Sequence, residues 1–188
     1  MKDVIKLMYE EIIDLLKLHG VELDIGLTYE EITKIEEIYK IKFPDSLKEF
    51  FMVALPISNG FYNWRNFEYD NINYIKHMIK KPIEDIDDLA EEVYWCDEWG
   101  EKPEDKKLIA KNVRERLKNA PKLLPIYIHR YMPMILDDNP PIVSIHGIDI
   151  IYYGESLKDY IQIEFGKKNQ KDIDFQSIIP IPFWSDIM

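Results

Sequence analysis

Two histidines and an aspartate are the residues of this sequence best suited to chemistry. His129 and His146 lie in neighbouring strand-forming segments, and Asp149 follows closely. Asp137 and Asp138 lie between the histidines. Imidazole and carboxylate groups together can bind a transition metal or transfer a proton. A structural role is the favoured interpretation, because His129 alternates with tyrosines and the sequence places His146 in a turn at the far end of a strand from it. Asp149 begins a strand, where a carboxylate accepts backbone hydrogen bonds.

The motifs of common enzyme families are absent from the sequence. It contains no Gly-x-Gly-x-x-Gly or Walker-type phosphate loop, no Gly-x-Ser-x-Gly elbow and no His-Glu-x-x-His. The single cysteine, Cys96, cannot build a thiolate zinc site or an internal disulfide. We therefore expect no catalytic residues, no cofactor and no metal. The sequence also shows no signal peptide and no membrane span, so a cytoplasmic location without membrane contact is expected.

The charge of the chain is concentrated in two adjoining segments. Of a net charge of -11, residues 84–105 contribute eleven acids and one base, whereas residues 106–122 contain seven bases and one acid. An acidic protein repels phosphates, which disfavours direct nucleic-acid binding, but its acidic surface attracts a basic protein. A merely solvated helix face is the alternative. The expected contact residues under the first interpretation are Glu91, Glu92, Asp97, Glu98, Asp137 and Asp138.

The Trp64-Arg65 pair is a further candidate for partner contact. It lies in a turn-rich link rather than in a periodic element, and Trp and Arg are enriched among interface hot spots. Closure of the core is the alternative, and the sequence leaves both open.

Arg130 has a structural role in the expected fold. It shares a strand face with two isoleucines, where a charge requires a partner, and Asp149 on an adjacent strand is the expected one. Tyr131 and Tyr153 are expected to stabilise the same sheet.

Hydrophobic periodicity predicts helices in the first part of the chain and strands later. Spacings of three and four predict helices over 3–19, from Thr28 and after Pro44, with capping boxes at Thr28–Glu31 and Ser46–Glu49. Pro82 predicts a break before a new helix. The remaining helices are expected over 103–120 and 157–165.

Alternation of apolar side chains predicts the strands. They are expected over 126–131, 142–145 and 148–153, with a two-residue turn at 146–147 and an extended, proline-rich tail over 179–184. Helices followed by strands predict an α+β fold, with a mostly antiparallel sheet wrapped by helices, in one domain over 1–188.

Several of these segments carry a family resemblance. The most specific are Leu-Pro-Ile-Tyr-Ile-His-Arg-Tyr-Met-Pro at 124–133 and Asp-Ile-Ile-Tyr-Tyr-Gly at 149–154, followed by Leu157-x-x-Tyr160. The link from Pro56 to Trp64-Arg65 is a further distinctive segment, and the helix motif of Phe43-Pro44 with Leu47 and Phe50 is a weaker one. Together they resemble the SUKH superfamily, the Smi/Knr type of domain, over about residues 27–165. The helix over 1–20 and the tail over 166–188 lie outside the resemblance.

The resemblance implies a binding protein rather than a catalyst. Bacterial SUKH proteins are chiefly immunity proteins that neutralise polymorphic or contact-dependent toxins, often nucleases or deaminases. Fungal relatives regulate cell-wall assembly and signalling. The resemblance thus favours an immunity protein that occludes the active site of a basic toxin domain. A regulatory or scaffold protein of cell-wall or stress pathways is the alternative.

Overall fold

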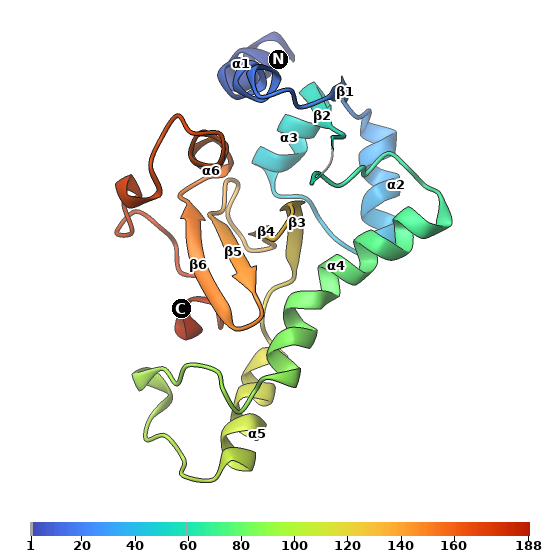
Figure 1. The fold of residues 1–188 in the computed structure, drawn as a ribbon. Coiled ribbons are helices and arrows are strands. Elements are labelled where there is room, and N and C mark those ends of the chain that lie inside the picture. Colours follow the sequence, from blue (N-terminus) through green and yellow to red (C-terminus); the bar gives the residue numbers. More distant parts are fainter. Residues whose placement is uncertain (1, 59) are drawn as a thin grey trace.

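The fold is α+β, with helices first, then a four-stranded antiparallel sheet and a further helix (Figure 1). The computed structural model describes residues 2–58 and 60–188. Its main helices are α1 (Lys2–Leu18), α2 (Tyr29–Tyr39), α3 (Asp45–Val53), α4 (Tyr69–Asp88), α5 (Lys106–Leu117) and α6 (Leu157–Glu164). Its strands are β1 (Leu23–Ile25), β2 (Ala54–Pro56), β3 (Leu123–Tyr127), β4 (Arg130–Pro133), β5 (Ile142–His146) and β6 (Asp149–Gly154). Short 3-10 turns, η1 (Asp97–Trp99), η2 (Gln170–Asp172) and η3 (Ser185–Ile187), complete it.

The four strands pair in chain order, β3-β4-β5-β6, and apolar residues cover both faces of their sheet. Leu124 and Met132 join the core cluster formed with α1, α2, α3 and α6. Their neighbours Leu123 and Tyr131 join a second cluster, formed with α5 and the C-terminal tail. Since successive strand residues point to opposite faces, one sheet serves both clusters. α4 contributes to both, because Ile75 belongs to the first cluster and Ile86 to the second.

The N-terminal caps of α2 and α3 differ in how well the local sequence predicts them. The capping box at α2 is confirmed: Thr28 Oγ1 accepts from the Glu31 amide at 3.2 Å, and the Glu31 carboxylate accepts from the Thr28 amide at 2.8 Å. The capping box predicted at Ser46 and Glu49 is wrong, because α3 begins at Asp45 and its N-cap residue, Pro44, makes no side-chain hydrogen bond. Ser46 is instead buried inside the helix.

Pro82 does not interrupt the helix in which it lies, so the predicted helix break at this position is wrong. α4 continues through it from Tyr69 to Asp88. A proline inside a helix removes one backbone hydrogen bond. Here Ile79, Pro82 and Ile86 lie buried on the same helix, and burial of such apolar surface offsets that loss. The long helix carries the chain from the body of the molecule to the outlying α5 (Figure 1).

The predicted strand over 126–131 is in fact interrupted by a tight turn. Ile128 and His129 connect β3 to β4, and Ile128 has a φ of 49°. The left-handed backbone at Ile128 reverses the chain direction, whereas the alternation of side chains predicted one continuous strand. The second turn, at 147–148, lies one residue later than predicted, and the tail turns at 182–184 instead of staying extended.

Candidate functional site: the acidic loop

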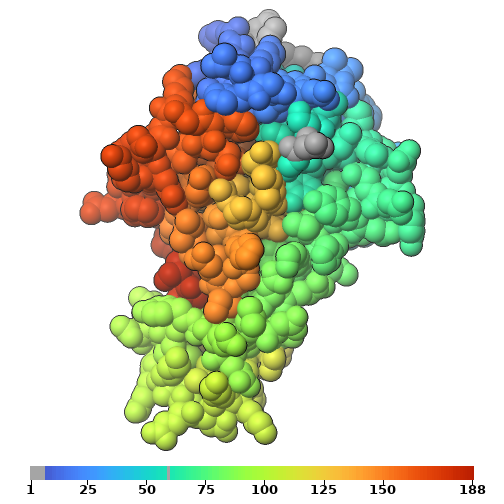
Figure 2. Space-filling view, viewed as in Figure 1, coloured from blue at the N-terminus to red at the C-terminus, as the bar shows by residue number. Residues whose placement is uncertain are grey.

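An acidic loop, residues 89–105, joins α4 to α5 at the outer end of the molecule. It carries seven carboxylates and one lysine, a net charge of -6. Figure 2 shows this region, coloured yellow-green, as a lobe that projects from the rest of the protein. The acidic side chains of the loop are exposed, so the lobe presents their charge to an approaching partner.

Two tryptophans, Trp95 and Trp99, hold the acidic loop against the rest of the protein. Trp95 is 9% exposed, and its indole N–H donates to the Gly100 carbonyl at 2.8 Å. The Trp99 ring packs edge-on against Trp95, and its own N–H donates to Asp186 at 3.2 Å. Gly100 has a φ of 86°, a backbone conformation that glycine adopts without strain. The apolar residues thus turn inward while their acidic neighbours remain outside.

The carboxylates of the loop are largely uncompensated. Asp105 caps α5 by accepting from the Lys107 amide at 2.8 Å. The other six form no ion pair within the described part of the chain: Glu91, Glu92, Asp97, Glu98, Glu101 and Glu104. Among the described residues, no base of α5 forms an ion pair with them, and Arg114 pairs instead with Asp87 of α4 at 2.8 Å. The negative potential of the loop is therefore available to an incoming cation.

A surface pocket of about 660 Å³ lies between the acidic loop and the β5–β6 turn. Three acidic residues, Glu92, Asp97 and Glu101, and one base, Lys102, line it together with Tyr94 and Ile148, so its lining has an excess of negative charge. Tyr94 is 58% exposed, so part of its ring is open to solvent. Carboxylates beside an accessible aromatic ring favour a lysine or arginine side chain through charge and cation–π attraction.

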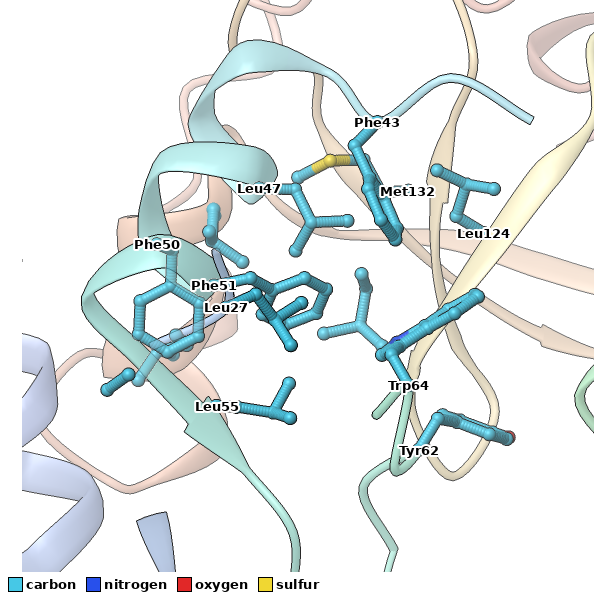
Figure 3. Close-up of a cluster of buried hydrophobic side chains, with 14 of the residues drawn as sticks. Leu27, Phe43, Leu47, Phe50, Phe51, Leu55, Tyr62, Trp64, Leu124 and Met132 are labelled. Carbon is cyan, nitrogen blue, oxygen red and sulfur yellow. The ribbon is translucent and has the colours of Figure 1, made fainter. Parts of the chain in front are cut away.

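Trp64 is not a contact residue, which corrects one sequence prediction. It is 1% exposed and lies in the first core cluster, edge-on to Phe43 at 5.2 Å and to Tyr39 at 5.3 Å (Figure 3). A side chain this deeply buried cannot reach a partner without unfolding its surroundings. The core-closure alternative is correct, because the link folds back over α2 and α3.

Arg65 connects this link to the β1–α2 junction. Its guanidinium donates to Glu31 at 2.8 and 3.2 Å, to Asp24 at 2.7 Å, and to the carbonyls of Ile25 and Gly26 at 2.9 and 3.0 Å. The hydrogen bonds from Arg65 hold the pKa of both carboxyls below their usual values. With five hydrogen bonds made internally, Arg65 has a structural role in this fold.

Asp137 and Asp138 lie apart from the acidic loop. They belong to the connection that precedes β5, whereas the acidic loop meets Ile148, beyond the other end of that strand. Asp137 accepts from the Asn139 amide at 3.0 Å, and the Asp138 carbonyl accepts from the Ser46 amide at 2.8 Å. The six predicted acidic contacts therefore form two separate groups. The acidic loop carries four of them, Glu91, Glu92, Asp97 and Glu98.

His129 and His146 lie close together, contrary to the sequence prediction. Their ring centroids are 6.2 Å apart, because the β3–β4 turn lies beside the end of β5, where the Ile145 amide donates to the His129 carbonyl at 3.0 Å. Both line a groove of about 460 Å³ against α4. Burial, and then the charge of Arg130, lower the pKa of His129. Among the described residues, no three potential metal ligands come together.

Arg130 is held by a partner other than the predicted one. Its Nε donates to Glu164 at 2.9 Å, its Nη1 to Ser144 Oγ at 2.9 Å, and its guanidinium lies 3.8 Å from the centre of the Tyr153 ring. Asp149 is exposed at the start of β6, opposite His146. The expected Arg130–Asp149 pair is wrong because the partner comes from α6, which strand alternation cannot reveal. Tyr131 is buried, 2% exposed.

Comparison with protein-family models, curated proteins and solved structures gave no match. The resemblance to the SUKH superfamily therefore stays a prediction based on the motifs quoted above. None of the described helices is long and apolar enough to cross a membrane.

Among the residues that line the acidic pocket beside Glu92 and Asp97, the sequence did not single out Tyr94, Glu101 or Ile148. Tyr94 and Glu101 lie within the acidic segment, so its charge was a usable signal for Glu101. Nothing in the sequence indicates that Ile148, more than forty positions later, completes the same pocket. That contact depends on how α4 crosses the sheet.

Proposed function

We propose that this protein is a non-catalytic, protein-binding module of the SUKH type. In this proposal it is an immunity protein that neutralises a basic toxin domain, of the nuclease or deaminase class, by occluding its active site. The observation that carries the proposal is the acidic loop on its projecting lobe: six of its carboxylates form no ion pair among the described residues, and three of them, from Glu92, Asp97 and Glu101, line a pocket with the exposed Tyr94. The motif resemblance supports the same function independently.

The mechanism follows from charge. An enzyme that acts on nucleic acid needs a positive surface to hold phosphates, and an acidic protein can occupy that surface instead. The loop attracts such a partner over roughly one Debye length, about 8 Å at physiological salt. A lysine or arginine of the partner enters the pocket beside Tyr94, and the lobe then covers the partner's active site sterically.

The test uses the protein encoded beside this one as the candidate partner. A pull-down establishes binding, and stopped-flow measurements at increasing salt give the association rate. The combined variant Glu92→Gln, Asp97→Asn, Glu101→Gln should reduce the association rate about tenfold at low salt, because it removes three charges from the encounter surface.

A matched control changes the charge equally elsewhere. Glu10→Gln, Glu30→Gln and Glu37→Gln neutralise three exposed carboxylates on α1 and α2 and should leave the rate nearly unchanged. If both triple variants slowed association alike, net charge rather than the acidic loop would be responsible. If deletion of the gene were harmless while the toxin is present, the immunity function would be wrong, and the regulatory alternative would stand.

A further inference from the structure

A second pocket lies at the opposite end of the molecule from the acidic loop. It has a volume of about 430 Å³ and is lined by the ends of several elements, around α1, β2, β3 and α6 (Figure 1). Three half-buried aromatic rings form its floor: Phe61, Tyr127 and Phe165. These rings come from distant parts of the sequence, and no periodic pattern connects them.

The three rings pack in a compact group. Centroids of Phe61 and Tyr127 are 4.7 Å apart, those of Tyr127 and Phe165 6.1 Å, and those of Phe61 and Phe165 6.4 Å with nearly parallel planes. His19 adds a fourth ring, 5.4 Å from Phe165. Stacked and tilted arrangements at these separations are favourable for aromatic side chains. The group therefore stands as a fixed surface within the pocket.

The backbone fixes the position of this aromatic floor. A bridge pairs Phe61 with Tyr127, and the Ile128 amide donates to the Gly60 carbonyl at 2.8 Å. Gly60 has a φ of 95°, and a Cβ there would lie 2.4 Å from the Tyr127 ring. Only glycine lets the chain pass so close to that ring. The local backbone is thus arranged to bring Phe61 and Tyr127 together.

The polar groups at the rim favour a positive ligand. The Glu22 carboxylate lines the pocket, is exposed and has no ion pair among the described residues. His19 donates from Nδ1 to the Leu15 carbonyl at 3.0 Å, which leaves Nε2 as an acceptor in the neutral ring. None of the described residues that line the pocket is a lysine or an arginine. The one formally charged carboxylate in the lining, Glu22, thus has no cationic neighbour among the described lining residues, which favours a cation over an anion.

We propose that this pocket binds an organic cation, either a guanidinium or a quaternary ammonium group. Aromatic faces carry negative quadrupole potential and attract such cations, which lose little hydration on contact. The Glu22 carboxylate adds a charge of opposite sign at the rim. This site is separate from the acidic loop and does not depend on the proposed neutralising function.

The test is an NMR titration of the full chain with choline and with N-acetylarginine amide at millimolar concentrations. Shifts confined to residues around Phe61, Tyr127 and Phe165 are expected for at least one of them. The probe that binds more tightly identifies the source, a small quaternary ammonium compound or an arginine side chain. A neutral isostere, 3,3-dimethylbutanol, should bind more weakly than choline, because it keeps the shape without the charge.

Two variants weaken the site by different means. Phe165→Leu removes one aromatic face, and Glu22→Gln removes the carboxylate charge; each should raise the dissociation constant roughly two- to fivefold. Phe175→Leu and Glu37→Gln are matched controls on exposed residues outside the pocket and should change nothing. The proposal is overturned if neither cation binds, if the neutral isostere binds equally well, or if both pocket variants bind as the wild type does.

Discussion

Replacement of Arg65 by methionine is the sharpest test of the structural role assigned to that residue. The sequence left open whether Arg65 contacts a partner, whereas the structure places five hydrogen bonds on its guanidinium and leaves the side chain 22% exposed. Methionine keeps most of the apolar stem and removes the charged head. The variant thus separates hydrogen bonding from packing.

The expected loss of stability is about 2–3 kcal/mol. A hydrogen bond to a charged group contributes about 1.5–3 kcal/mol, and the bidentate contact with Glu31 falls at the upper end. The carbonyls of Ile25 and Gly26 lie near the surface, so water replaces the lost donor there and limits the cost. For a domain of this length, the melting temperature should fall by roughly 4–12 °C.

Chemical denaturation at neutral pH measures this loss, with Arg114→Met as the control. Arg114 is also paired with one carboxylate, but its side chain is 47% exposed, so its loss should cost less than about 1 kcal/mol. Arg65→Lys should restore only part of the stability, since an ammonium group cannot reproduce the planar fork. If Arg65→Met unfolded like the wild type, the structural assignment would be refuted.

The same variant predicts a pH dependence. Hydrogen bonds from Arg65 lower the pKa of Asp24 and Glu31 below their ordinary values of 3.8 and 4.5. A carboxyl with a lowered pKa stabilises the fold above its unfolded value, and this contribution disappears as the pH falls through the folded value. The stability difference between wild type and Arg65→Met should therefore shrink in acid.

Three further predictions concern the sheet. Arg130→Ala should cost about 3 kcal/mol by leaving Glu164, whose side chain is only 17% exposed, without its partner, and the pair Arg130→Met with Glu164→Leu should recover most of that loss in denaturation experiments. Because the pKa of His129 is lowered below 6.5 in the fold, stability should decline as the pH falls below that value, and His129→Gln should flatten the melting-temperature profile there. Gly154→Ala should destabilise by about 1–3 kcal/mol, since its Cβ would lie 2.7 Å from the backbone of Tyr160; an unchanged melting temperature would contradict this.

Periodicity predicted elements well where one face of a regular element carries the signal. α2 and α6 agree with the sequence because each has a side-chain cap and an apolar stripe. Periodicity did not predict the structure where contacts between distant parts of the chain determine whether a helix continues or a strand turns. Pro82 remains inside α4 because buried isoleucines hold both sides of the helix. The turn at Ile128 was invisible because its left-handed backbone is stabilised by Gly60 and Tyr62 from another part of the chain.

The candidate site was predictable in its charge but not in its shape. Composition alone located the acidic segment and four carboxylates that prove to be exposed. It could not show that Ile148 closes the pocket or that Asp137 and Asp138 lie beyond the other end of β5. Spatial neighbours that are distant in sequence, such as His129 with His146 and Arg130 with Glu164, leave no periodic signal.

The motif residues are constrained by packing in the core, whereas the carboxylates of the acidic loop are not. Within the run at 124–133, Leu124, Arg130 and Tyr131 are buried, and Gly154 is required by the close approach of Tyr160. These residues determine how the sheet packs, so their types are constrained by the core. The acidic carboxylates are exposed and make few internal contacts, so they can change without disturbing that packing. A fold of this kind can thus keep its sheet while the sequence of the loop between α4 and α5 changes, as the proposed immunity function would require for specificity toward different partners.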